Sequence, residues 1–377
     1  MLRTRLRLIT LIGAAALLIL LAPRGGSSAQ VTAHVQAIAY TSANISLFAT
    51  GLDNPRGLTF GPDGNLYVAE GGRGGLESTV GLCQQAPPPV GPNTGGMTAR
   101  ISRISPSGRR TTVVDDLPSS QTSPTFDSQV TGVADVRFID NTLYGLEAGA
   151  GCANGIKEKP NAILRIDRAE HEAAYIANLS QFFMTHPVKH PNPPDFDPDG
   201  VPYSMISVGR ALYMIEANHG ELDKIEPNGT ISRIVDISAT QGHIVPTGLA
   251  FHDGNFYVSN IDGEAPGAAH IYKITPDGQI SILFSGLTEV LGIAFDPCDR
   301  LYALESYTGN QLYAPGSGTI VRWTTAGTME TVATGLTTAT AMAFGPDGKI
   351  YVSNNGFNFQ PGQGQIVRVD TNVNACS

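Results

Sequence analysis

Six polar residues recur at one place in a sequence repeat, three positions after a tyrosine, and their side chains are of the kind that binds hard cations. Four are glutamates and two are asparagines: Glu70, Glu147, Glu216, Asn260, Glu305 and Asn354. Carboxylate and amide oxygens are the ligands that Ca²⁺ prefers. We therefore predict a ligand-binding ring with calcium as its candidate cofactor. The alternative is that these side chains accept hydrogen bonds from backbone amides at strand ends.

Two histidines are the candidate catalytic residues, because imidazole can take up and release a proton near neutral pH. His219 lies in the segment Glu216-Ala217-Asn218-His219-Gly220-Glu221, and His243 follows in Gln241-Gly242-His243. We include Asn218, Glu221 and both histidines among the predicted ligand-binding residues. A base beside a bound cation would suit hydrolysis. The alternative is a partly buried polar network that joins neighbouring parts of the fold.

Several motifs of known enzymes fail in this sequence. His219-Gly220-Glu221 matches half of the zinc deaminase signature, but no Pro-Cys-x-x-Cys follows it. Gly71-Gly72-Arg73-Gly74-Gly75 precedes no helical pattern, so it does not predict a dinucleotide site. Neither a Walker sequence nor Gly-x-Ser-x-Gly occurs.

The repeat that carries the six polar residues predicts the fold. Its tyrosines are Tyr67, Tyr144, Tyr213, Tyr257, Tyr302 and Tyr351. Most copies are preceded by a Gly-Leu-Ala-Phe-like strand and a tight turn such as Gly61-Pro62-Asp63-Gly64, and two further strands follow. Four antiparallel strands in roughly 45 residues are typical of one propeller blade. We predict an all-β, six-bladed β-propeller with four-stranded antiparallel blades.

The blades account for the chain after residue 29. We place them at 54–117, 130–179, 200–237, 245–287, 290–336 and 340–370, within a single domain of residues 30–377. The last blade lacks its fourth strand, and residues 45–50 resemble fourth strands elsewhere in the repeat. We therefore predict that the N-terminal strand closes the last blade and leaves no open edge.

Loop lengths predict which face of the propeller binds. The connections after the second strands are long, for example 71–99 and 148–160, whereas the opposite face has only tight turns. Binding residues concentrate on long loops held by a rigid scaffold. We expect a small molecule or a protein to bind on the long-loop face, at an acidic channel mouth.

The N-terminal residues predict export. Residues 1–29 combine three early arginines with an apolar run and end in Ser-Ser-Ala, the pattern of a cleaved signal peptide. No cysteine follows the run, so we expect no membrane anchor and a secreted or periplasmic protein. Removing four arginines from 24 basic residues leaves 20 against 33 acidic ones, a net charge of −13. Such a surface repels nucleic acid, and we expect a monomer.

Four cysteines in an exported chain favour disulfides. Cys83 and Cys152 lie in long loops of adjacent blades, while Cys298 and Cys376 lie on the opposite, short-turn face. A disulfide spans only a few ångströms between Cα atoms, so bonds across the disc are excluded. We predict the pairs Cys83–Cys152 and Cys298–Cys376.

The repeat resembles the NHL-type propellers of the TolB-like class, and longer segments resemble the ScyD/ScyE family. These segments are 149–152, 197–203, 216–223 and 241–247, and the resemblance as a whole covers nearly all of the mature chain. The resemblance implies an exported propeller of the kind encoded beside scytonemin pigment biosynthesis. It implies no particular reaction.

These observations favour a binding or scaffolding module over an enzyme, because no complete set of nucleophile, base and orienting group is present. The first alternative is a metal-dependent, lactonase-like hydrolase. The second is a quinone-dependent sugar oxidoreductase, since residues 51–58 resemble the pyrroloquinoline-quinone sugar dehydrogenases. The His-Asn-Gly-Gly segment of those enzymes is absent from the sequence.

Overall fold

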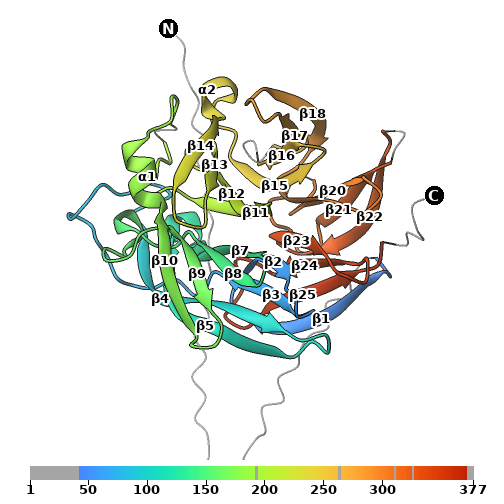
Figure 1. Cartoon of the computed structure of the whole chain (residues 1–377), viewed down its shortest axis with the longest axis horizontal. Coiled ribbons are helices and arrows are strands. Elements are labelled where there is room, and N and C mark those ends of the chain that lie inside the picture. Colours follow the sequence, from blue (N-terminus) through green and yellow to red (C-terminus); the bar gives the residue numbers. More distant parts are fainter. Residues whose placement is uncertain (1–41, 192–193, 262–264, 310, 325–326, 372–377) are drawn as a thin grey trace, which may run out of the picture. The chain divides into compact units, whose positions relative to one another are not determined.

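Short strands alternate with tight turns along the chain, and in the computed structural model they form six antiparallel sheets. The structure describes residues 42–191, 194–261, 265–309, 311–324 and 327–371, all within one compact unit, Ala39–Ser377. Figure 1 shows the six sheets arranged as the blades of a propeller ring. The predicted fold class is confirmed.

Each blade is built from consecutive strands, apart from the last. Blade 1 contains β2 (Pro55–Phe60), β3 (Leu66–Glu70), β4 (Thr94–Ile104), β5 (Arg110–Gln121) and β6 (Val130–Thr131). Blade 2 contains β7 (Val133–Ile139), β8 (Thr142–Glu147), β9 (Ala162–Asp167) and β10 (Glu172–Asn178). Blade 3 contains β11 (Pro202–Val208), β12 (Ala211–Glu216), β13 (Glu221–Ile225) and β14 (Ile231–Asp236).

The second half of the ring repeats this arrangement. Blade 4 contains β15 (Pro246–His252), β16 (Asn255–Asn260), β17 (Ala269–Ile274) and β18 (Ile280–Leu287). Blade 5 contains β19 (Val290–Phe295), β20 (Leu301–Glu305), β21 (Gly318–Trp323) and β22 (Met329–Leu336). Blade 6 contains β23 (Ala341–Phe344), β24 (Ile350–Asn354), β25 (Gly364–Val369) and β1 (Ile45–Leu52).

The N-terminal strand closes the ring, as predicted. β1 pairs with β25 in antiparallel register, with Ile45 opposite Val369 and Leu52 opposite Gly364. In Figure 1 the blue strand β1 lies beside the red strand β25. The pairing covers the edge that three C-terminal strands alone would leave open.

The repeat tyrosine recurs because it has two structural tasks. The Tyr67 hydroxyl donates to the Asp63 carboxylate at 2.9 Å and so holds the turn between β2 and β3. Tyr351 and Asp347 form the same contact in blade 6, at 3.2 Å. The Tyr67 ring is buried and packs edge-on against Phe138 of the next blade, with 5.0 Å between ring centroids.

The hydrophobic core lies between the blades. Each of its six clusters joins side chains of two neighbouring blades; one unites Ile101 of blade 1 with Val133 and Leu164 of blade 2. A blade therefore buries each apolar face against a neighbour, and the ring distributes its hydrophobic stabilisation over six interfaces.

Blade 1 differs from the sequence-based expectation. β4 begins at Thr94, inside the segment expected as a loop, and β5 continues to Gln121, beyond the expected end at residue 117. The two strands form a long hairpin whose open end, opposite its turn, pairs with Glu77 and with β6, so the inserted residues continue the sheet.

Short helices lie in connections between strands: η1 (Pro124–Phe126), η2 (Cys152–Asn154), α1 (Leu179–Thr185) and α2 (Ser238–Gln241). Within the described ranges, none of the helices has the length and hydropathy needed to span a membrane. The predicted signal peptide, residues 1–29, lies outside the described residues.

Candidate functional site

The first strand of five blades carries a β-bulge at the same place. The register against the second strand shifts between Pro55 and Leu58 in β2, and between Val133 and Asp135 in β7. β11, β15 and β19 show the same shift. A bulge turns one side chain out of the regular alternation of the sheet. The residues at this position are Arg56, Ala134, Tyr203, Thr247 and Leu291, and Thr340 directly precedes β23 in blade 6.

A cavity of about 570 Å³ lies at the centre of the ring. Residues of all six blades line it, and four of the bulge residues are among them: Arg56, Ala134, Tyr203 and Leu291. Much of the remaining wall is apolar, including Leu249, Ile293 and Met342. Small-molecule sites typically enclose about 300–1,000 Å³ and combine apolar walls with a few polar groups. The bulges therefore place variable side chains of the repeat in a cavity of suitable size.

Tyr203 reaches across this cavity. Its hydroxyl lies 3.5 Å from the carbonyl oxygen of Thr340, which belongs to blade 6, whereas Tyr203 belongs to blade 3. Burial raises the pKa of Tyr203, so the phenol keeps its proton at neutral pH and can act as a hydrogen-bond donor.

Arg56 is the cation of the cavity wall that forms no ion pair with any described residue. Its Nη2 donates to the carbonyl oxygen of Val130, and its Cζ lies 6.0 Å from the centroid of the Phe357 ring. By contrast Arg137, which also lines the cavity, pairs with Asp135 at 2.7 Å.

Asp135 stands where three other blades have glycine in the repeat. A Cβ atom on Gly57 would lie 2.0 Å from an oxygen of Asp135, so blade 1 needs glycine here. Asp135 accepts hydrogen bonds from the backbone of Val136 and Met205 as well as from Arg137. Burial raises its pKa to about 6 despite these donors.

Both predicted histidines contact the segment that precedes β11, which includes Asp195 and Asp197. His243 Nε2 lies 3.4 Å from a carboxylate oxygen of Asp195, and His243 lines the cavity. His219 Nε2 lies 2.8 Å from the carbonyl oxygen of Asp197. Asn218 binds the backbone of both aspartates, because its side-chain amide donates to the carbonyl of Asp195 and accepts from the backbone amide of Asp197.

The two histidines differ in access to the cavity. His219 is buried, and its ring stacks on Phe196 with 4.9 Å between centroids and packs edge-on against Phe183. A carbonyl oxygen only accepts, so His219 Nε2 carries the proton in this contact. The side chain of His243 is 21% exposed, and of the two histidines it is the one that lines the cavity.

The six repeated polar residues are all buried, and each accepts a hydrogen bond from backbone. The amide donors are Asp53 for Glu70, Gly149 for Glu147, His270 for Asn260, Thr288 for Glu305 and Thr337 for Asn354, and Glu216 accepts from Val201, Asn218, His219 and Gly220. In four cases the donor lies just before the first strand of a blade, so the side chain fixes the start of that strand; these side chains are Glu70, Glu216, Glu305 and Asn354. This geometry is the backbone-capping alternative of the sequence analysis.

None of the six lines the central cavity. In the part of the chain that the structure describes, no three His, Cys, Asp or Glu side chains form a group that could hold a metal ion. Calcium binding by these residues stays a prediction. Glu221 also lies outside the cavity wall, where it is buried and pairs with Arg233. Of the predicted ligand-binding residues, the structure brings Asn218 and His243 to the cavity.

Burial shifts the protonation of several of these acids. It raises the pKa of Glu147 to about 8, and that of Glu70 and Glu305 to about 7. Glu70 has Arg110 at 3.1 Å, which opposes the shift, whereas one oxygen of Glu147 has no hydrogen-bond partner. Glu147 is therefore the acid of this set that most clearly prefers its neutral form.

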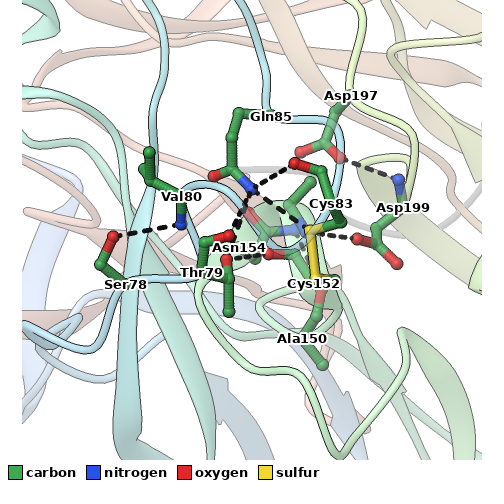
Figure 2. The surroundings of a disulfide bond; sticks show 11 residues. Ser78, Thr79, Val80, Cys83, Gln85, Ala150, Cys152, Asn154, Asp197 and Asp199 are labelled. Carbon is green, nitrogen blue, oxygen red and sulfur yellow. Dashed lines mark hydrogen bonds between the residues drawn. A yellow bond between two sulfur atoms is a disulfide. The ribbon is translucent and has the colours of Figure 1, made fainter.

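A disulfide fixes one wall of the cavity (Figure 2). Cys83 and Cys152 are bonded, with 6.3 Å between their Cα atoms, which confirms the first predicted pair. The bond ties the segment after β3 to η2, and Thr79 also donates to the carbonyl of Cys152. Asn154, the last residue of η2, lines the cavity together with Asn93. The second predicted pair includes Cys376, which lies outside the described residues.

The comparisons with known proteins support the fold. No family model matches this sequence, and no curated protein matches it. The chain shares its fold with a gluconolactonase. That protein, from Xanthomonas campestris and described as important in glucose secondary metabolism, is 12% identical, with a TM-score of 0.51 over 89% of this chain and 92% of its own.

Two other solved structures show the same likeness. A candidate glucose dehydrogenase from Thermus thermophilus is 16% identical, with a TM-score of 0.53 over 86% of this chain and 99% of its own. A Bacteroides thetaiotaomicron protein of unknown function is 12% identical, with a TM-score of 0.55 over 86% of this chain and 75% of its own. At such identities the likeness establishes the six-bladed propeller alone.

Proposed function

We propose that this protein binds a small organic molecule in the central cavity of its propeller. The observation that carries the proposal is the cavity itself, about 570 Å³ in volume, with a largely apolar wall and a few polar side chains. Arg56, Tyr203 and His243 are the side chains suited to orient a ligand there. The sequence also favours a binding role. It predicts the site at the six repeated polar residues, whereas we propose it in the cavity lined by the first strand of each blade.

The binding proposal is tested with a neutral fluorescent probe, N-phenyl-1-naphthylamine. We expect saturable fluorescence enhancement, which the variant Ala134→Trp abolishes because the indole fills the cavity. The matched control is Ala169→Trp, at an exposed turn position, which should bind the probe as the unaltered protein does. Equal binding by the two tryptophan variants would show that the cavity is not the site.

Lactone hydrolysis is the second candidate function, and the His243–Asp195 pair in the cavity wall favours it. His243 would take a proton from water, whose oxygen attacks the lactone carbonyl carbon. The ring carbon–oxygen bond then breaks, and the leaving alkoxide regains the proton, which gives a hydroxy acid. Asp195 would orient and stabilise the protonated imidazole. The fold shared with a gluconolactonase is compatible with this chemistry.

An assay of D-glucono-1,5-lactone hydrolysis, followed by proton release, decides between the two candidates. If the protein is a hydrolase, His243→Gln should lose turnover while it retains folding and binding of N-phenyl-1-naphthylamine. Assays in calcium chloride and in chelator also test the predicted calcium dependence. A cation present at a hundred times its Kd should in addition stabilise the fold by about 2.7 kcal/mol. If no turnover is seen in any condition, the hydrolase candidate is rejected and binding is the remaining function.

We further propose that the protein is an exported, monomeric member of the ScyD/ScyE family. The segments quoted above support the family, and the signal-like residues 1–29 together with the Cys83–Cys152 disulfide support an oxidising compartment. N-terminal sequencing of the protein recovered from the periplasm or medium tests the export and the cleavage site.

A further inference from the structure

Arg56 is unlike the other arginines in the inner part of the fold. Arg100 and Arg110 pair with Glu70, Arg137 pairs with Asp135, and Arg233 pairs with Glu221. Arg56 is partly buried, yet no carboxylate of a described residue forms an ion pair with it. Charges removed from water are normally paired. We therefore expect the anionic partner of Arg56 to be a group other than the described residues.

The guanidinium has unused hydrogen-bonding capacity at the cavity. Arginine carries five N–H donors, and toward the described residues the Arg56 side chain uses one of them, in the bond from Nη2 to the Val130 carbonyl. Because Arg56 lines the cavity, a ligand there can reach the remaining donors. A planar fork of this kind matches the oxygens of a carboxylate or sulfonate.

The acids of the cavity wall have contacts of their own and form no ion pair with Arg56. Asp135 pairs with Arg137, and a carboxylate oxygen of Asp195 lies 3.4 Å from Nε2 of His243. Burial and the neighbouring Asp199 raise the pKa of Asp197 to about 8, so that this carboxyl is largely neutral at pH 7. Arg56 is thus the arginine of the cavity wall that no carboxylate of a described residue pairs with.

We propose that Arg56 binds the acidic group of an organic anion, a carboxylate or sulfonate, whose apolar body lies against Leu249, Leu291, Ile293 and Met342. This inference rests on the proposed function, because it requires a small molecule in the central cavity. It adds the chemical class of that molecule and the residue that selects it. The bulge at the start of β2 places the selecting side chain in the cavity.

Two related dyes test the inference by fluorescence titration. 8-Anilinonaphthalene-1-sulfonate is an organic anion, and N-phenyl-1-naphthylamine has the same aromatic body without the charge. Arg56→Met should raise the Kd of the anionic dye at least tenfold and change that of the neutral dye less than twofold. Arg56→Lys, which keeps the charge without the fork, should raise the Kd of the anionic dye two- to fivefold. Circular dichroism checks the folding of each variant.

Arg103→Met is the matched control, because Arg103 is exposed on β4 and is not in the cavity wall. It should change the Kd of neither dye. If Ala134→Trp releases both dyes but Arg56→Met shifts both Kd values equally or shifts neither, the anion inference is wrong and the binding function stands. If neither dye binds, or if Ala134→Trp leaves both bound, the binding function and the inference both fail.

Discussion

At the scale of single residues, the buried glutamates and asparagines at the ends of second strands stabilise backbone that would otherwise lack a partner. Glu305 accepts from the Thr288 amide at 2.8 Å, just before β19 begins, and Asn354 accepts from Thr337 at 2.7 Å. A buried amide without an acceptor costs about 1–3 kcal/mol. Glutamate is charged in water, however, so its use in a buried cap makes stability depend on pH.

Glu147→Gln should make the protein more stable at pH 8 and leave it nearly unchanged at pH 5. Burial raises the pKa of Glu147 from 4.5 to about 8, so the folded state holds a proton that the unfolded state releases above pH 4.5. The stability that depends on this proton is complete below pH 4.5 and is lost as the pH rises towards 8. Glutamine cannot ionise, and we expect a gain on the order of 2 kcal/mol at pH 8.

Urea denaturation at the two pH values measures this difference, with Glu170→Gln at an exposed turn as control. The assignment fails if Glu147→Gln shows the same loss of stability between pH 5 and 8 as the unaltered protein.

The repeated residues are easier to identify from the sequence than the residues of the site. The repeat tyrosine, such as Tyr67, and the polar residue three positions later, such as Glu70, recur in all six blades, where the polar residue caps backbone amides. The turn in which the tyrosine binds an aspartate, such as Asp63, recurs in blades 1 and 6. The cavity wall is built from positions where the repeat varies, such as Arg56, Ala134 and Tyr203. Their place in the bulge depends on strand register, which the spacing of motifs does not reveal. An alignment of the six blades, searched for the position whose residue type varies most, would have indicated the bulge position.

At the scale of elements, the long connections of blades 1 and 2 pack into one assembly beside the cavity. Asn93 donates to the side chain of Asn154 at 2.9 Å, and the Cys83–Cys152 bond lies between the same two connections. The spacing of motifs could not predict the long β4–β5 hairpin, because residues 94–99 lack the repeat and their strand pairing is with β5 and Glu77.

Removing the disulfide should loosen this wall. We expect Cys83→Ser combined with Cys152→Ser to lower the free energy of unfolding by about 2–4 kcal/mol, since the bond closes a loop of 69 residues. The Kd of N-phenyl-1-naphthylamine should rise, because Asn93 and Asn154 line the cavity. Thermal melts and dye titrations measure both effects. Reduced, unaltered protein should lose at least as much stability, because reduction also breaks the predicted Cys298–Cys376 bond. An unchanged Kd in the double variant would separate the Cys83–Cys152 disulfide from the site.

Asn161 joins three backbone segments of this assembly. Its Oδ1 accepts from the Ala150 amide at 2.9 Å, and its Nδ2 donates to the carbonyls of Asp199 and Gly200 at 3.1 and 2.9 Å. The side chain is buried, so water cannot replace it. Asn161→Ala should therefore cost about 3 kcal/mol in urea denaturation. Asn141→Ala, at an exposed turn, is the control, and equal effects of the two would contradict this role.

At the scale of the whole molecule, the ring depends on the pairing of β1 with β25. The pairing also buries Ile45, Ala49 and Leu52. Sequence alone predicts this closure, because one strand is missing at one end of the repeat and one is spare at the other.

A chain that begins at residue 53 should lose cooperative unfolding, because blade 6 would expose the edge of β25 and part of its apolar face. A chain that begins at residue 42 keeps β1 and is the matched control. Calorimetry compares the two, and a sharp transition of unchanged enthalpy in the shorter chain would contradict the closure.

The pairing of the first described strand with the last also sets the order of events when the chain is made. β1 leaves the ribosome early, but Val369, the partner of Ile45, is added more than 300 residues later. Until then blades 1 to 5 can assemble only as an open arc with two unmatched ends. Every chain that stops before β25 therefore keeps a free strand and an incomplete blade that complement those of a second such chain. Premature termination should thus produce head-to-tail oligomers in place of soluble fragments. The ring can close only after the last strand, β25, has been made.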